Sequence, residues 1–325
     1  MDLTPYGGPK DGYVQDFAIQ EIDLFTNKLL FFWDALQHIP LANSFEPASS
    51  ATASSNIWDA YHLNSIGLTD SVDDILVSGR NTSTIYRINK PTGGIVWQLG
   101  GKQTSFTIES GAEFSWQHDA RFLPNNLISM FDDNSDNSDI PGPYSHGLIL
   151  QLDLVNMTAS EYREYYHNPN IIVPSQGSLQ SLANGNKFIG WGQLPYYSEF
   201  SDAGNSSADP TSSLLYEAQI PSSNYSYRAY RNDWIGQPFY PPSIGLISTS
   251  GQITVYASWN GSTETTQWQL FAGSKSKKLS LVGTVAKSSF ETSIPTSKKG
   301  PYFQVKALNA SGNVIGESAI IKVKK

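Results

Sequence analysis

Two of the five histidines in this 325-residue chain stand at matching positions in two strand-like segments. His62 is the second residue of YHLNSIGL, and His118, 56 residues later, is the second residue of QHDARFL. A neutral imidazole can act as a nucleophile, and near neutral pH it can carry a proton to or from a substrate. Another interpretation remains open, in which each histidine only forms hydrogen bonds within a wall of the fold.

Strands must position these side chains, because period-2 alternation and turn residues run through most of the chain. No apolar spacing typical of an amphipathic helix persists beyond two turns, so we predict an all-β protein. Four strands recur in each of three units. The units comprise 61–66, 73–80, 83–89 and 94–100, then 117–123, 126–133, 147–153 and 159–165, then 175–182, 186–193, 213–220 and 225–231.

Four-stranded units in series are typical of a β-propeller, in which the innermost strand of each blade lines a central channel. We predict that residues 1–237 form about three and a half such blades, the half blade coming from two strands in 21–33. The repeat then brings His62, His118 and Gln176 to equivalent heights around one axis. Because propellers have four to eight blades, either a small four-bladed ring or further blades ahead of residue 1 are expected.

The pattern changes after residues 238–245 (PFYPPSIG), which we predict to be a linker. Short strands with frequent turns follow in 246–325, and Trp259 or Trp268 fits an immunoglobulin-like or fibronectin-type-III-like sandwich. Residues 272–325 hold 10 lysines against two glutamates, whereas residues 1–271 hold 11 Lys and Arg against 27 Asp and Glu. The lysines are not interleaved with aromatic residues, so the sequence favours a solvated surface over a nucleic-acid site.

The amino-acid composition excludes several kinds of site and of protein. The chain has no cysteine, which excludes disulfides and cysteine nucleophiles, and no apolar run long enough for a membrane span. The sequence that opens with residue 1 has neither a basic segment nor an apolar stretch, so it predicts no signal peptide within this chain. Secretion is nevertheless suggested by six N-x-Ser/Thr sequons, which are candidate glycosylation sites: Asn81, Asn156, Asn205, Asn224, Asn260 and Asn309.

The acidic segment 132–139 (DDNSDNSD) has oxygen ligands at alternate positions. Asp132, Asn134 and Asp136 could hold Ca²⁺ weakly, but the glycine and final glutamate of an EF-hand loop are missing. A solvated acidic loop is the alternative, and we predict no other cofactor. The remaining histidines lie in turn or loop contexts and are predicted to be at the surface: His38, His146 and His167.

Several motifs in one register, from about residue 2 to residue 235, resemble the arylsulfotransferase family and most closely its secreted fungal branch. They are WDAYHLNSI, DDILVSGRNTSTIYRINKPTGGIVWQLGG, FSWQHDARF, ISMFDD and SQGSLQSLANGNKFIGWGQLPYYSEF. The resemblance implies a six-bladed propeller that moves a sulfuryl group from an aryl sulfate to a phenol, without a nucleotide sulfate donor, through a sulfated histidine. The family also carries an Asp-x-His-Glu histidine in earlier blades, for which this chain has no counterpart.

The resemblance implies catalytic roles for four residues. His118 would be the nucleophile, Arg80 would hold two sulfuryl oxygens, and Asn64 would donate an amide N–H. His62 would donate to the sulfuryl group or carry the proton of the phenol, and it shares a face with Asn64 if their strand is regular. Substrate contacts are expected from three further residues: Gln176, Ser178 and Arg121.

Two classes of function therefore stay open. One is an enzyme with a small aromatic sulfate donor and a phenolic acceptor. The other is a propeller that binds an aromatic molecule or a protein partner in its channel without turnover. The formal charge of −16 on residues 1–271 would repel an anionic sulfate at long range, so local cations such as Arg80 and Arg121 would have to outweigh it.

Overall fold

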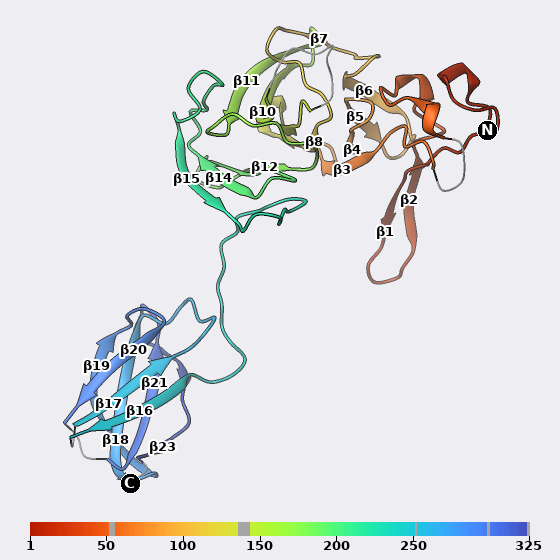
Figure 1. Cartoon of the computed structure of the whole chain (residues 1–325). Helices are drawn as coiled ribbons and strands as arrows, with labels where there is room; N and C mark the ends of the chain where they lie inside the picture. The colour runs from red at the N-terminus through yellow and green to blue at the C-terminus, as the bar shows by residue number, and fades with distance from the viewer. Residues whose placement is uncertain (52–55, 136–143, 251, 298–299, 324–325) are drawn as a thin grey trace. The chain divides into compact units, whose positions relative to one another are not determined.

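The computed structural model describes residues 1–51, 56–135, 144–250, 252–297 and 300–323. The chain divides into two compact units, Met1–Arg231 and Asn232–Lys325 (Figure 1). Both units are built from strands, which confirms the all-β prediction.

Three sheets of the first unit are each formed by strands that are consecutive in the chain. The first has the order β3-β4-β5-β6, the second β7-β11-β10-β9-β8 and the third β12-β13-β14-β15. All pairings are antiparallel except that of the short strand β7 with β11. The bounds are β3 Leu63–Leu68, β4 Asp74–Gly79, β5 Thr84–Asn89, β6 Ile95–Gly100, β7 Thr107–Ile108, β8 His118–Leu123, β9 Leu127–Asp132, β10 His146–Asp153, β11 Thr158–Tyr166, β12 Ser178–Ser181, β13 Lys187–Gly190, β14 Tyr196–Phe200 and β15 Leu214–Gln219.

The hydrophobic core lies between successive sheets. One cluster joins the first sheet to the second, with Leu76 and Ile85 against Leu148 and Leu150. Another joins the second sheet to the third, where Phe131 meets Trp191 edge to face. The leading strands β3, β8 and β12 lie side by side (Figure 1). This stacking of consecutive antiparallel sheets is propeller-like, and it brings the starts of the leading strands together.

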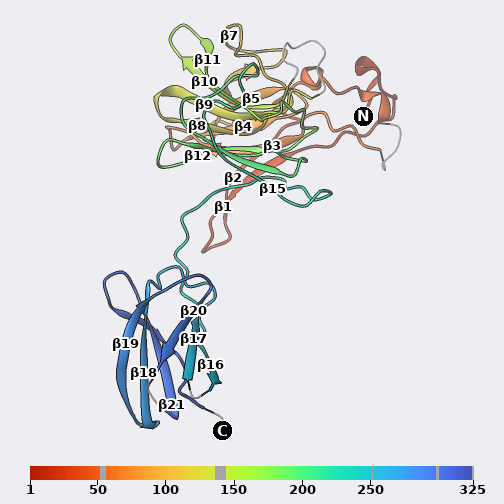
Figure 2. The same cartoon turned by 60° about the vertical axis from the view of Figure 1, so that its left-hand side comes forward.

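A two-stranded hairpin precedes these sheets. It consists of β1 (Ala18–Ile22) and β2 (Leu29–Asp34), and it projects from the first unit (Figure 2). Trp33 is buried against the first sheet, and its Nε1 donates to the carbonyl of Gly93. Three short 3₁₀ helices flank the hairpin, and a fourth connects β8 to β9: η1 Thr4–Tyr6, η2 Leu41–Asn43, η3 Ala48–Ser50 and η4 Pro124–Asn126.

The third unit of the predicted repeat differs from the structure. Its third strand is β14, a stretch that the sequence pattern did not single out, and residues 225–231 form no strand. The return segment, residues 221–231, instead runs along β12 and bonds to its side chains. The N–H of Ala229 donates to Ser178 Oγ, and the N–H of Arg231 donates to Gln180 Oε1. Side-chain acceptors thus replace a strand ladder.

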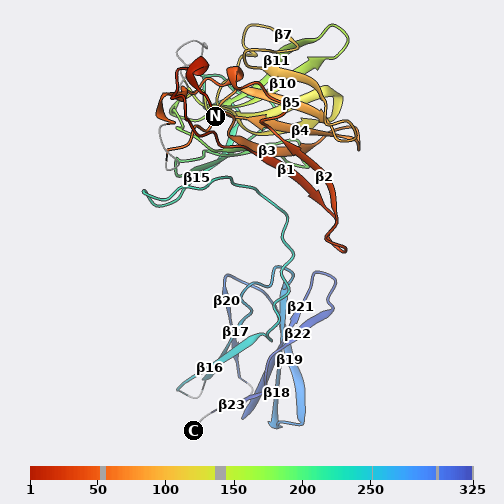
Figure 3. The same ribbon diagram turned by 90° about the vertical axis from the view of Figure 1, so that its right-hand side faces the viewer.

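The second unit contains two sheets that share one core. Strands β16, β17 and β20 form one sheet, and β19, β18, β21 and β22, with β23 paired to β21, form the other (Figure 3). Trp268 and Phe303 are fully buried between them. The predicted linker 238–245 overlaps the first strand, because β16 begins at Ser243. The bounds are β16 Ser243–Thr249, β17 Gln252–Ser258, β18 Gln267–Lys275, β19 Lys278–Ala286, β20 Glu291–Thr296, β21 Tyr302–Leu308, β22 Val314–Glu317 and β23 Ile321–Lys322.

Candidate active site

The starts of the leading strands form a polar site with a constrained backbone. Gln117 anchors the start of β8 to the first sheet, since its Nε2 donates to Ser78 Oγ at 3.0 Å and to the carbonyls of Gly79 and Thr84 at 3.2 Å. Left-handed backbone at non-glycine residues costs about 1–3 kcal/mol each and clusters at functional sites. Five such residues lie here: His62, Ser83, Trp116, Asp119 and Gln176.

His118, the first residue of β8, is buried and paired with a carboxylate. Its Nδ1 lies 2.5 Å from Oδ2 of Asp133, and the side chains are only 1% and 0% exposed. Asp133 directly follows β9, the neighbour of β8, so the strand pairing itself brings the two groups together. A contact of this length holds one proton between the two atoms, and it leaves Nε2 as the ring nitrogen available to a substrate.

Burial controls the charge of this pair. It lowers the pKa of His118 to about 3, with further contributions from the positive charge of Arg80 and from His62. Burial also raises the pKa of Asp133 well above its usual range, while Arg80 acts in the opposite direction and favours the carboxylate. The imidazole is therefore uncharged at neutral pH, as a nitrogen nucleophile must be.

His62 lies opposite and is built similarly, but it is open to solvent. Its Nδ1 lies 2.5 Å from Oδ2 of Asp59, and its side chain is 45% exposed. The same aspartate accepts from the backbone N–H of His62 at 2.9 Å, which fixes the left-handed residue. The rings of His62 and His118 lie 6.4 Å apart at 72°. One buried and one exposed imidazole thus meet in one place.

Arg80 follows β4 and reaches the same site. Its guanidinium lies 4.6 Å over the ring of Trp116 and donates to Oδ1 of Asn81 at 2.9 Å. A weak ion pair with Glu46 measures 3.9 Å. Nε of Arg80 is buried and has no hydrogen-bond partner within the described ranges. Nη2 donates to the carbonyl of Pro174 at 3.4 Å, a long contact. Arg80 is therefore a cation held by stacking, whose terminal N–H groups are only partly used within the protein.

Asn64 does not stand as a regular strand would place it. Strand β3 has a bulge between Leu63 and Ser65, and His62 precedes it in a left-handed conformation, so the expected shared face of His62 and Asn64 does not follow from strand geometry. Nδ2 of Asn64 donates to the carbonyl of Gln117 at 2.7 Å. One amide hydrogen is thus used to join β3 to β8.

The three predicted substrate contacts are bonded within the protein to different degrees. Ser178 is buried, and its hydroxyl both donates to and accepts from Ala229. Arg121 is paired with Asp119 and also donates to the carbonyl of Ile66 at 2.7 Å. Both groups therefore stabilise strand contacts. Gln176 precedes β12, and its Oε1 has no partner in the part of the chain that the structure describes.

Sequence reasoning missed three charged residues of the site. Asp59 lies three residues before His62, a spacing that could have been noticed. Asp133 lies in the acidic segment 132–139, for which the sequence predicts a weak Ca²⁺ site or a solvated loop, although it follows an apolar strand. Arg228 lies in the return segment, where its guanidinium contacts Asp119 at 3.1 Å and the carbonyl of Asn64 at 2.6 Å.

Two histidines predicted to be at the surface are in fact buried. His146 begins β10 and stacks on Tyr166 at 4.6 Å, and burial lowers its pKa to about 4. His167 follows β11 and packs edge to face on Trp191 at 5.0 Å, with Nε2 3.2 Å from Glu217. Aromatic rings from neighbouring strands hold both histidines in place. The polar residues beside them in the sequence gave no indication of this burial. His38 is half-buried and stacks on Trp33.

The acidic segment and one sequon also differ from expectation. Asp132 and Asn134 are buried at the end of β9, so this part is no solvated loop, while Asp136 lies outside the described residues. The amide of Asn81 is buried and donates to the carbonyl of Asp59, which leaves no room for a glycan there. Within the described residues, no cluster of three or more metal-ligating side chains is present, and no helix is long and apolar enough to cross a membrane.

The first unit is thus an all-β, propeller-like protein with a histidine and arginine site at the starts of its leading strands. A family model described as Arylsulfotransferase (ASST) matches residues 1–210, well over half of the chain. The chain belongs to the arylsulfotransferase family, which confirms the family predicted from the motifs. A search of curated proteins found no match.

Solved structures resemble the chain only at the level of a β-rich fold. A protein of unknown function from Bacteroides caccae is 14% identical, with a TM-score of 0.36 over 96% of this chain and 92% of that one. Hydrazine synthase of Kuenenia stuttgartiensis is 8% identical, with a TM-score of 0.31 over 75% of this chain and 55% of that one. Hsv2 of Kluyveromyces lactis is 10% identical, with a TM-score of 0.29 over 79% of this chain and 62% of that one. Such scores carry no functional argument.

Proposed function

We propose that this chain is an aryl sulfotransferase that moves a sulfuryl group from an aryl sulfate to a phenol through a sulfated His118. The observation that carries the proposal is the buried His118–Asp133 pair, which keeps the imidazole uncharged and leaves Nε2 available. Arg80 supports it, because a stacked guanidinium with spare donors suits the oxygens of a sulfuryl group.

In the first half-reaction, Nε2 of His118 attacks sulfur, an N–S bond forms and the S–O bond to the aryl group breaks. The departing phenolate takes a proton from His62, whose exposure and Asp59 partner suit proton exchange. In the second half-reaction, the acceptor hydroxyl returns its proton to His62, and its oxygen attacks sulfur as the N–S bond breaks. Asp133 holds the Nδ1 proton throughout.

The wider architecture belongs to the same proposal. The three consecutive sheets, of four, five and four strands, would be blades of a propeller, and the second unit would be an immunoglobulin-like sandwich. We further propose that the protein belongs to the secreted fungal branch of the family. Among the candidate sequons, Asn156, Asn224 and Asn260 are exposed and suit glycosylation.

The test is release of 4-nitrophenol from 4-nitrophenyl sulfate by the full chain with phenol as acceptor. We expect turnover by the wild-type protein, its loss in His118→Asn, and near wild-type turnover in the control His38→Gln, which alters a histidine outside the site. Binding of the aryl sulfate without turnover would instead support a binding protein, and equal turnover by His118→Asn would refute the nucleophile.

A further inference from the structure

The hairpin of β1 and β2 has only two strands, whereas each of the three sheets that follow has at least four. Within the described residues β1 pairs with β2 alone, so its other edge is open. The N–H of Ala35 donates to the carbonyl of Phe17 at 2.8 Å, which sets the alternation of the antiparallel ladder. The backbone N–H and C=O groups of Ala18 and Gln20 therefore point to the open edge, where they can pair with another strand.

The turn after β1 shows which strand of a sheet it represents. Asp23 accepts from the N–H three residues further on, and Asn89 at the end of β5 and Asp153 at the end of β10 do the same. β1 therefore corresponds to β5 and β10, and β2 corresponds to β6 and β11. On their other side, β5 pairs with β4 and β10 pairs with β9. The open edge of β1 is thus the edge that β4 and β9 fill in the next two sheets.

The leading strand of the first sheet, β3, has one covered face and one open face. Ser65 faces β8, since its Oγ accepts from the N–H of Ala120 at 3.1 Å. On the opposite face Ile66 is 52% exposed and Leu68 is 82% exposed. The corresponding strand β8 packs between β3 and β12, so it has neighbours on both sides. Among the described residues, β3 has no such strand on the side of the hairpin.

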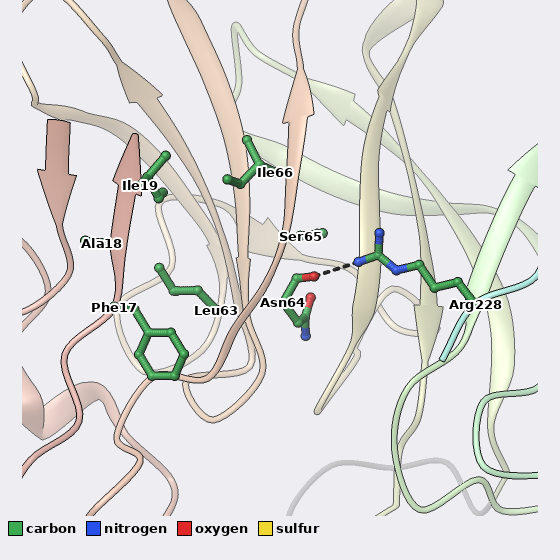
Figure 4. Close-up of a pocket in the computed structure, with 8 residues that line it drawn as sticks. All are labelled: Phe17, Ala18, Ile19, Leu63, Asn64, Ser65, Ile66 and Arg228. Atoms are coloured by element: carbon green, nitrogen blue, oxygen red, sulfur yellow. Dashed lines mark hydrogen bonds between the residues drawn. The ribbon is translucent and has the colours of Figure 1, made fainter. Parts of the chain in front are cut away.

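A cavity of about 290 Å³ lies between the hairpin and β3. Phe17 and Ile19 at the hairpin face Leu63 and Ile66 on β3 across it (Figure 4). The rest of the lining is partly polar, so a purely apolar ligand would fit it poorly. An extended strand carries both kinds of group, because its backbone is polar and its side chains alternate between two faces. The cavity therefore suits a strand laid along β1 with side chains against Leu63 and Ile66.

The strands in the equivalent places show which side chains such a partner needs. β4 (DILVSG) is buried throughout, and β9 (LISMFD) is buried from its second residue on. Both carry large apolar residues at successive positions, as strands covered on both faces do. The open edge of β1 therefore fits an apolar strand better than one with alternating charges.

We propose that the groove between β1 and β3 is a docking site for an extended apolar strand of a separate partner protein. The strand pairs with the backbone of Ala18 and Gln20 and packs on Ile66 and Leu68. In this mode of recognition, main-chain hydrogen bonds supply affinity and side-chain pockets supply specificity. The proposal goes beyond sulfate transfer and does not depend on it.

The test is a titration of a fluorescent peptide with the full chain, followed by anisotropy. The probe has the sequence DDILVSGR of residues 73–80, which contains β4. Two further probes carry N-methyl groups on alternate residues, one at the positions of Ile75 and Val77, the other at those of Leu76 and Ser78. Because the N–H groups of a strand alternate between its two edges, only one of these probes loses bonds to β1. We expect that probe to bind about thirtyfold more weakly, which corresponds to two hydrogen bonds, and the other to stay within about threefold.

A proline at the open edge provides a second test. Gln20→Pro removes an N–H that points away from β2, so the hairpin keeps its ladder. We expect this variant to bind the unmodified probe at least about tenfold more weakly. The matched control is Gln219→Pro on β15, the open edge of the third sheet. The N–H of Gln219 also points outward, because that of the next residue, Ile220, donates to the carbonyl of Pro195.

Three results with the wild-type protein, none of which needs a variant to fold, would overturn the proposal: no saturable binding of the unmodified probe, equal weakening of both N-methylated probes, or weakening of neither. Loss of binding in Gln219→Pro but not in Gln20→Pro would overturn it too, since the peptide would then pair with another edge. Sedimentation velocity without peptide tests the remaining alternative. Self-association that Gln20→Pro abolishes would show that a second copy of the chain, and not a separate partner, covers this edge.

Discussion

His118 owes its predicted reactivity to its surroundings. Its partner Asp133 comes from the adjacent strand end, and burial keeps a second proton off the ring. The His62–Asp59 pair has the same Nδ1–Oδ2 distance, but its side chains are partly exposed to solvent. In the proposed reaction, His118 would attack sulfur, and His62 would exchange protons with solvent and substrate.

The carboxylate partner of His118 is expected to be essential. In Asp133→Asn the side-chain amide would donate to Nδ1 and force the proton onto Nε2, which removes the attacking lone pair. We expect kcat to fall about 10³- to 10⁴-fold, as for a misoriented tautomer in a catalytic triad. Initial rates of 4-nitrophenol release measure this, and a melting temperature near that of the wild type is the control. Turnover within threefold of wild type, or about half a logarithmic unit, would exclude the assigned positioning role.

A second prediction concerns the buried Asp132, whose pKa burial raises to about 8. The folded state then binds a proton that the unfolded state releases, so stability falls as pH rises from about 4 to 8. Asp132→Asn cannot ionise, yet its Oδ1 can still accept from the N–H of Ser115, as Asp132 does at 3.0 Å.

We therefore expect the melting temperature of Asp132→Asn, relative to wild type, to be higher at pH 9 than at pH 5. Each kcal/mol in the free energy of unfolding corresponds to a shift of about 2–4 °C in the melting temperature. Calorimetric scans at both pH values measure the difference, with Asp153→Asn as control because hydrogen bonds from Asn156 lower the pKa of that aspartate. A difference that does not change with pH would show that Asp132 ionises freely.

At the scale of elements, the return segment is a connection that holds the leading strands together. Arg228 joins it to Asp119 on β8 and to the carbonyl of Asn64 on β3. Ala229 bonds to Ser178 on β12. One irregular stretch thus spans the starts of all three leading strands.

Removing the charge of Arg228 should therefore destabilise the first unit. Arg228→Met would leave the buried Asp119 with Arg121 alone, and we expect a loss of about 2–4 kcal/mol in the free energy of unfolding. Urea denaturation followed by tryptophan fluorescence measures it. Lys10→Met, which removes an exposed cation of the same unit, should stay within about 0.5 kcal/mol. If the two variants lose equal stability, the segment does not serve as a connection.

Much of this arrangement was predictable from sequence, because strand alternation and turns are local signals. The hairpin, the first sheet, strands β8 to β11 of the second sheet and the approach of His62 to His118 follow from the repeat. Partners that depend on tertiary contacts were not predictable. Asp133 lies in a run of polar residues, which gives no sign of its burial. The alternation in residues 225–231 is typical of a strand, but backbone N–H groups of this segment donate to side chains of β12 and form no ladder with a neighbouring strand.

At the scale of the whole molecule, net charge works against binding of the proposed sulfate donor. Residues 1–271 carry a formal charge of −16, and an aryl sulfate is an anion. Raising the ionic strength from about 0.01 M to 0.15 M shortens the Debye length from about 30 Å to 8 Å and screens this repulsion.

We therefore expect kcat/KM for the sulfate donor to rise with salt, by about tenfold at most, the lower end of electrostatic steering effects. The KM of an uncharged phenol should change little over the same range, which provides the control. Initial-rate measurements in sodium chloride decide the point. A fall in kcat/KM for the donor would mean that the local field of Arg80 dominates at long range as well as in the site.

The central claim is that His118 carries the sulfuryl group. The most direct measurement incubates the full chain with 4-nitrophenyl sulfate in the absence of acceptor and maps the added mass by peptide mass spectrometry at alkaline pH. We predict one SO₃ group on the peptide that contains His118, its loss on addition of phenol, and its absence in His118→Asn. Turnover with no modified peptide, or with the group on another residue, would contradict the account.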